Sequence, residues 1–105
     1  MPGQDVDIYI SISSASGEIA YSSEEQHVYK GYSVTWKCES PFAVEFIEED
    51  PLEQTDRRSA PKGTSHEVGA KVRGDARPGK YKYACAVFSE EQVYLDAACP
   101  VIIID

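Results

Sequence analysis

Histidine, methionine and basic residues are scarce in this chain of 105 residues. It has two His, one Met and ten Lys plus Arg against eighteen Asp plus Glu, so its formal net charge is −8. Nucleic acids and anionic membrane surfaces are bound through a basic face, which this composition does not supply. We therefore expect neither of them as a partner.

Long apolar runs are also lacking. No stretch approaches the roughly 20 consecutive apolar residues that cross a bilayer. The N-terminal segment MPGQDVDIYISI has neither the basic start nor the apolar core of a signal peptide. We therefore expect a cytoplasmic protein.

Cysteine is present in an odd number, as Cys38, Cys85 and Cys99. Without an export signal, an odd count favours free thiols in a reducing compartment. No CxxC and no Cys/His pair has the spacing of a structural zinc site. Cys38 and Cys85 fall on inward-facing positions of two predicted strands, so a disulfide between them across the fold stays open.

Alternation of apolar and polar residues dominates the sequence, and helical periodicity is weak. It predicts one domain over residues 1–105, an all-β Greek-key sandwich of about seven to eight strands. Trp36, Tyr81 and Tyr83 have inward parity and are expected in the core. The polar segment Glu48–Ser65 is predicted to be a long loop, and the C-terminal VIIID to be a strand buried on both faces. The longest predicted strands are Val6–Ile12, Val34–Glu39, Phe42–Ile47, His66–Val72 and Lys80–Val87.

Two segments carry a family resemblance. KGYSVTWKCESPFAVEF (residues 30–46) has a Gly, a Val-Thr-Trp strand, a Pro and then an apolar strand that begins at Phe42. PGKYKYACAVF (residues 78–88) is a Gly-x-Tyr strand that leads to Cys85. The order and spacing of these parts resemble cupredoxins, the family of plastocyanin and azurin. The resemblance covers residues 5–105 and implies a β-sandwich.

The metal ligands of that family are not kept. A blue-copper centre uses two imidazoles, a thiolate and a weak axial sulfur. Carried over position by position, the resemblance keeps the thiol as Cys85 but puts Phe42 and Phe88 at the two imidazole positions. The only Met is Met1. The resemblance therefore implies the fold and argues against copper, so we expect no metal, no other cofactor and no catalytic residue.

An immunoglobulin-like sandwich is the alternative fold. Tyr83-Ala84-Cys85 has the spacing of a tyrosine corner, with Tyr two residues before Cys. Immunoglobulin domains place their core Trp after the first Cys, whereas Trp36 precedes Cys38 here.

Phe42 and Phe88 are the candidate partner-binding residues. At the ligand positions they would meet at one pole of the sandwich. There they would either fill the core or form an apolar contact patch with a polar rim, as partner surfaces do. The expected function is non-enzymatic: a copper-free module, monomeric or weakly self-associating, that binds a protein partner or acts within a larger assembly.

Two other functions stay open. A metal-binding or electron-transfer protein would use an atypical site built from Cys85, His27 and His66. A carbohydrate-binding sandwich would use exposed rings such as Tyr29, Tyr32 and Tyr94 as its platform.

Overall fold

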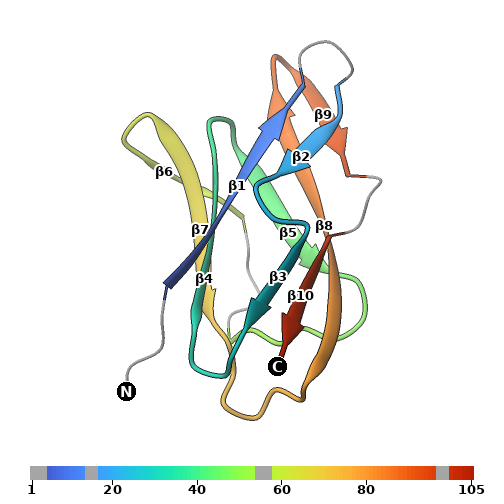
Figure 1. The fold of residues 1–105 in the computed structure, drawn as a ribbon. Helices are drawn as coiled ribbons and strands as arrows, with labels where there is room; N and C mark the ends of the chain where they lie inside the picture. The colour runs from blue at the N-terminus through green and yellow to red at the C-terminus, as the bar shows by residue number, and fades with distance from the viewer. Residues whose placement is uncertain (1–4, 14–16, 54–57, 97–99) are drawn as a thin grey trace.

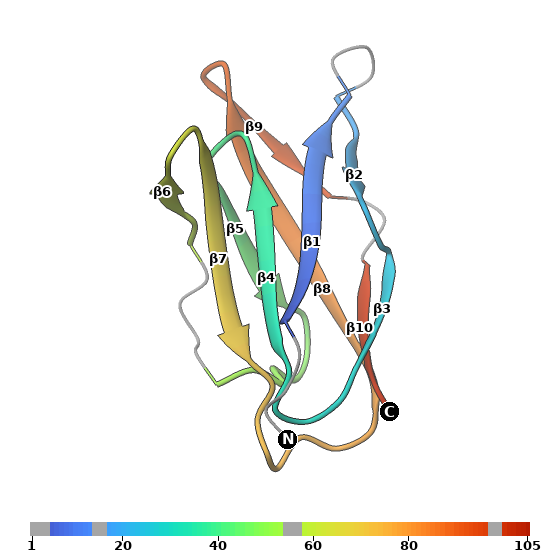
Figure 2. The same ribbon diagram turned by 60° about the vertical axis from the view of Figure 1, so that its left-hand side comes forward.

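A computed structural model describes residues 5–13, 17–53, 58–96 and 100–105, which form ten strands in two facing sheets (Figures 1 and 2). The first sheet has the order β2 (Ile19–Tyr21), β1 (Asp5–Ile12), β4 (Ser33–Cys38), β7 (Ser65–Lys71) and β6 (Ala60–Lys62). The second has the order β3 (Glu25–Val28), β10 (Val101–Ile104), β8 (Gly79–Ser89) and β5 (Phe42–Phe46), with β9 (Gln92–Leu95) also paired to β8. Both sheets are mixed, because β1 pairs with β4, and β3 with β10, in parallel. No helix able to cross a membrane occurs in the described ranges.

The predicted all-β sandwich is confirmed, and strand parity explains its core. Along β4, Val34, Trp36 and Cys38 are buried, and the residues between them are partly exposed. Tyr81 and Tyr83 are buried on β8 in the same way. Successive side chains on a strand point to opposite faces, so one apolar face of each sheet meets the other.

Two predictions need correction. The segment predicted as a long loop contains β6, which pairs with β7, and a buried Leu52 that bridges to Val72. An apolar side chain within a polar segment anchors it to the core, although the local sequence does not alternate. The C-terminal strand is buried on one face only: Ile102 and Ile104 are fully covered, whereas Val101 and Ile103 are partly exposed.

Aromatic rings form the centre of the core. The Trp36 and Tyr83 ring centroids lie 5.3 Å apart in an edge-on arrangement, and Phe46 lies 5.5 Å from Tyr83. Tyr21 contacts Tyr83 from the other side at 6.0 Å. Such pairs add about 0.5–1.5 kcal/mol each beyond the burial of their area. Trp36 Nε1 and the Tyr83 hydroxyl are buried in this cluster and have no hydrogen-bond partner in the described part of the chain, so the ring packing has to offset the desolvation of two polar atoms.

The long strand β8 organises the second sheet. Along one edge it pairs first with β10, opposite residues 79–82, and then with β9, opposite residues 86–89. Its other edge pairs with β5. A two-residue turn joins β8 to β9, with φ of 50° at Glu90 and 64° at Glu91. Positive φ at both central residues is the geometry of the hairpin turn whose twist matches the flanking strands. The β8–β9 hairpin therefore extends the sheet beyond Cys85.

Candidate functional site

Cys85, the residue at the position of the copper thiolate, is buried on the inner face of β8. The Asp96 backbone N–H donates to the Cys85 carbonyl oxygen at 3.0 Å, which brings the chain after β9 back to this level of β8. The hydroxyl of Tyr21, which belongs to the first sheet, donates a hydrogen bond to Asp96 Oδ2 at 2.8 Å and lies beside the Cys85 thiol. Cys85 is thus enclosed by a phenol, a carboxylate and the core.

These surroundings keep Cys85 in its thiol form. Burial raises the pKa of Cys85 to about 12; the hydrogen bond with the Tyr21 hydroxyl opposes this in part, and Asp96 and Cys38 each add a smaller increase. Desolvation disfavours the charged form of an acid. Burial also raises the pKa of Tyr21 and of Tyr83. Metal ligation and nucleophilic attack both require a thiolate, so this site favours neither.

Phe42 and Phe88 do not meet, and the predicted pole cluster is wrong. Phe42 is 2% exposed and packs inside, paired with Val87, whereas Phe88 is 47% exposed. The reason is strand parity. Because β8 continues without interruption from Cys85 to Ser89, Val87 points inward and Phe88 outward. Phe42 is a core residue, and only Phe88 is available to a partner.

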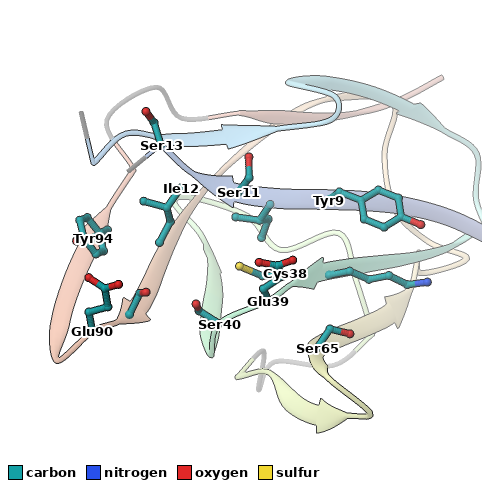
Figure 3. Close-up of a pocket in the computed structure, with 13 residues that line it drawn as sticks. Tyr9, Ser11, Ile12, Ser13, Cys38, Glu39, Ser40, Ser65, Glu90 and Tyr94 are labelled. Atoms are coloured by element: carbon teal, nitrogen blue, oxygen red, sulfur yellow. The ribbon is translucent and has the colours of Figure 1, made fainter. Parts of the chain in front are cut away.

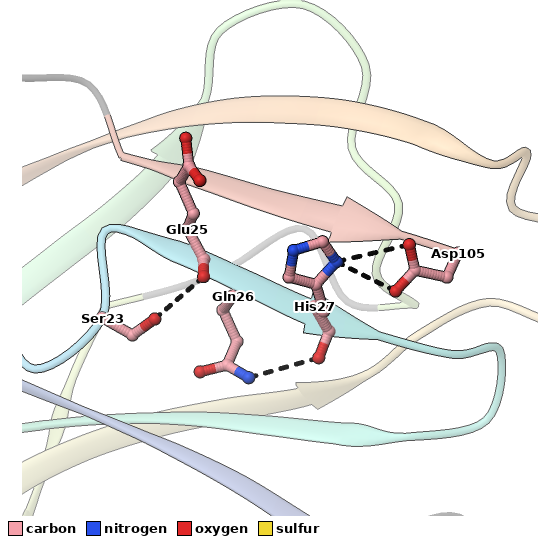
Figure 4. A network of polar contacts seen from close by, with 5 residues as sticks. All are labelled: Ser23, Glu25, Gln26, His27 and Asp105. Atoms are coloured by element: carbon pink, nitrogen blue, oxygen red, sulfur yellow. Dashed lines mark hydrogen bonds and ion pairs between the residues drawn. The ribbon is translucent and has the colours of Figure 1, made fainter.

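The two histidines lie on different elements. His27, on the edge strand β3, is exposed, and its Nδ1 lies 3.0 Å from Asp105 Oδ2 (Figure 4). His66, on β7, is paired with Cys38 of β4 and shares its face of the first sheet. Cys85, His27 and His66 lie on three different strands, and no group of three ligand side chains forms among the described residues, so the atypical site is not assembled.

The residues present do not fit the copper of cupredoxins. Phenyl rings replace both imidazoles, and one of these rings points away from Cys85. Within the described ranges, no group of three or more His, Cys, Asp or Glu side chains is placed to hold a metal ion. Cys38 and Cys85 are both free and buried, so the disulfide left open by the sequence is not formed, and Cys99 lies outside the described residues.

A pocket of about 670 Å³ opens at the hairpin end of the molecule (Figure 3). The ends of β1 and β4 form one wall, and Glu90 and Tyr94 of the hairpin face them. Cys38 lies on its floor, and serines from four segments line it: Ser11, Ser13, Ser40, Ser65 and Ser89. These groups can hydrogen-bond a polar molecule. Neither histidine is in the lining, and its ionisable side chains are Lys37, Glu39 and Glu90 beside Cys38 and the tyrosines.

The tyrosines proposed as a sugar platform are separated. The Tyr29 and Tyr32 rings contact each other in a tilted arrangement, with centroids 5.5 Å apart, in the connection from β3 to β4. Tyr94 lies on β9, at the opposite end of the sandwich (Figure 2), where its hydroxyl donates to Gln92 Oε1. Three rings at two ends do not make one platform.

Sequence reasoning missed the outer face of the β8–β9 hairpin. Directly paired residues in an antiparallel sheet share a face, so Phe88 lies beside Val93, and Ala86 beside Leu95. Val93 is 56% and Leu95 73% exposed. Phe88, Val93 and Leu95, which we call the hairpin face, form an exposed apolar surface. The sequence did contain its signal, since these residues have the parity opposite to Val87 and Tyr94.

The sequence matches no protein-family model and shows no significant similarity to a curated protein. One similar solved structure is a purple cupredoxin from Nitrosopumilus maritimus. It is 18% identical, with a TM-score of 0.58, and the match covers 96% of this chain and 100% of that one. Identity this low shows the fold alone. The fold predicted from the resemblance is confirmed, in preference to the immunoglobulin-like alternative: this chain is a cupredoxin-like β-sandwich.

Proposed function

We propose that this protein is a copper-free, non-enzymatic module that binds a protein partner through the hairpin face. The observation that carries the proposal is the exposure of Phe88, Val93 and Leu95 side by side on the outer face of β8 and β9. Contiguous apolar surface on a soluble protein marks an interaction site more often than scattered single residues do.

The shape and surroundings of the hairpin face support a macromolecular ligand. Ala84 and Ala86 of β8 and Ala43 of β5 continue the same outer face with small side chains. The surface is therefore broad and shallow and does not enclose a small molecule. An apolar centre surrounded by charged groups such as Glu45 and Glu90 is the usual anatomy of a protein interface.

Among the residues that the structure describes, Cys85 and the two histidines are not brought together, which supports the non-enzymatic part of the proposal. Cys85 is a protonated buried thiol, and the two histidines lie elsewhere on the sheets. The same features support a module without copper, because the residues at both imidazole positions have no metal-binding atoms.

Affinity capture with surface variants tests the proposal. The unmodified protein, the double variant Val93→Ser/Leu95→Ser and the control Ile47→Ser would each be used to capture partners from cells of the source organism. Ile47 is an apolar residue that is 54% exposed, as Val93 and Leu95 are exposed, but it lies just after β5 and outside the hairpin face. We expect one partner to be recovered by the unmodified protein and the control and lost with the double variant. Equal recovery by all three would overturn the proposal.

A further inference from the structure

The β8–β9 hairpin has an apolar face and, within the described part of the chain, an edge of β9 that pairs with no other strand. Asp96 N donates to the Cys85 carbonyl, and Phe88 N donates to the Pro41 carbonyl on the β5 side at 2.8 Å. Backbone groups alternate in direction along antiparallel strands. Val93 and Leu95, opposite Phe88 and Ala86, therefore direct their N–H and C=O groups away from β8.

These outward groups are available for pairing. Among the described residues, Val93 and Leu95 make no backbone hydrogen bond outside the β8–β9 ladder. β9 follows β10 along the same edge of β8, and β10 is covered on its outer side by β3. A strand added beside β9 would lie in line with β3, because β3 covers the outer edge of β10 in the same way. Its outward side chains would lie next to Val93 and Leu95.

The charges at the turn end of this edge are negative, because Glu90 and Glu91 are both exposed there. Glu45 lies across β8 on β5, and the exposed Lys80 and Lys82 lie at the other end of β8, opposite β10. Arg58, the cation opposite Ala43, already has an interaction within the chain. The whole chain carries −8. Basic residues at the end of a partner segment that meets the turn would therefore strengthen its binding. A second copy of this chain would bring further negative charge and is a less favourable occupant.

We propose that the free edge of β9 binds an extended segment of a partner protein by strand addition. In that segment apolar residues alternate with polar ones, and Lys or Arg lies at the end next to Glu90 and Glu91. Main-chain hydrogen bonds to Val93 and Leu95 supply affinity, and the alternating apolar side chains on the hairpin face supply specificity. This inference rests on the proposed function and names the chemistry of its partner.

Three capped heptapeptides test the chemistry of the segment. TVTVTKK carries both features, TVTVTEE reverses the charge, and TSTSTKK removes the apolar side chains. Binding would be followed by amide chemical shifts of the labelled protein and by calorimetry. We expect TVTVTKK to bind with shifts and slowed amide exchange at Val93 and Leu95, and the other two at least about tenfold more weakly. Equal binding of TVTVTEE would overturn the charge requirement.

Two variants test the mode of binding. Leu95→Pro removes an outward N–H without removing a β8–β9 hydrogen bond, and proline is tolerated at such an edge position; Leu95→Val keeps the N–H. We expect the Pro variant to lose TVTVTKK and the Val variant to bind it within about threefold of the unmodified protein. Glu90→Gln/Glu91→Gln, which leaves β9 unchanged, should weaken TVTVTKK several-fold and should not weaken TVTVTEE, which has no Lys to pair with these carboxylates.

Three outcomes separate this inference from the proposed function. If none of the peptides binds at β9, strand addition is wrong, whereas partner capture that depends on Val93 and Leu95 still supports the proposed function. Peptide binding that survives Leu95→Pro in a folded variant also overturns strand addition. Self-association through β9, detected by sedimentation, would make a second copy the occupant and overturn the partner chemistry.

Discussion

The two faces of β8 differ in what their residues do, although Cys85 and Phe88 are only three positions apart. The inner face carries Tyr83, Cys85 and Val87, all fully covered by the opposite sheet. The outer face carries Phe88, which is exposed beside Val93. One strand therefore contributes to the core through one face and carries the proposed partner surface on the other.

The largest expected change in stability comes from removing an aromatic ring from the inner face of β8, and removing one from the outer face is the comparison. We expect Tyr83→Ala to lower the free energy of unfolding by about 3–5 kcal/mol, because it empties the centre of the aromatic core. Phe88→Ala should change it by no more than about 0.5 kcal/mol, as for most surface positions. Urea unfolding of both variants measures the difference. Comparable losses would mean that Phe88 is part of the core.

Alkaline pH should lower the free energy of unfolding, because the ionisable groups on the inner face of β8 are buried. The pKa of Cys85 is raised to about 12 in the folded protein, so the unfolded thiol, with an ordinary pKa of about 8.5, ionises first. Stability is then fully present below about pH 8.5 and falls as pH rises toward 12, by about 1.4 kcal/mol per pH unit for this group. The raised pKa values of Tyr21 and Tyr83 act in the same direction.

Urea unfolding between pH 7 and pH 11 measures this dependence, with Cys85→Ala as the comparison. The variant should lose the contribution of the thiol and keep that of the two tyrosines, so its stability should fall less steeply. Identical slopes for the two proteins would show that Cys85 is not desolvated in the folded state.

Changes in the hairpin turn should have the smallest effect on stability, and they should raise it. Glu90 and Glu91 adopt the left-handed backbone conformation, which costs a residue with a side chain about 1–2 kcal/mol relative to glycine. We expect Glu90→Asn/Glu91→Gly to raise the free energy of unfolding by about 1–2 kcal/mol. Glu90→Gln/Glu91→Gln removes the same charges without easing the backbone. If it stabilised equally, charge repulsion and not backbone strain would be the cause.

The fold was predictable from alternation and spacing. The parity of Trp36, Tyr81 and Tyr83 gave their burial correctly, because an uninterrupted strand fixes the face of each residue. Short elements in polar segments were not predictable in this way. β6 contains Pro61 and no alternating apolar residue, and it exists because it pairs with β7, which is a tertiary contact.

The candidate site was predicted less well than the fold. Phe88 was assigned to a ligand position by its spacing from Cys85, and the predicted strand ended at Val87, one residue before it. β8 instead runs to Ser89 and turns at Glu90-Glu91, a pair without the Asn or Gly that usually signals such a turn. The exposed pairing of Phe88 with Val93 depends on that turn, so position matching alone could not find the hairpin face.

Copper titration most directly tests the proposal that this cupredoxin-like sandwich has no copper centre. The purified protein would be titrated with Cu(II) and followed by visible absorption and calorimetry, with Cys85→Ser in parallel. We predict no thiolate-to-copper absorption band and no one-to-one binding, because Phe42 and Phe88 supply no ligand atom and Cys85 is a buried thiol. A coloured one-to-one complex that disappears in Cys85→Ser would contradict this.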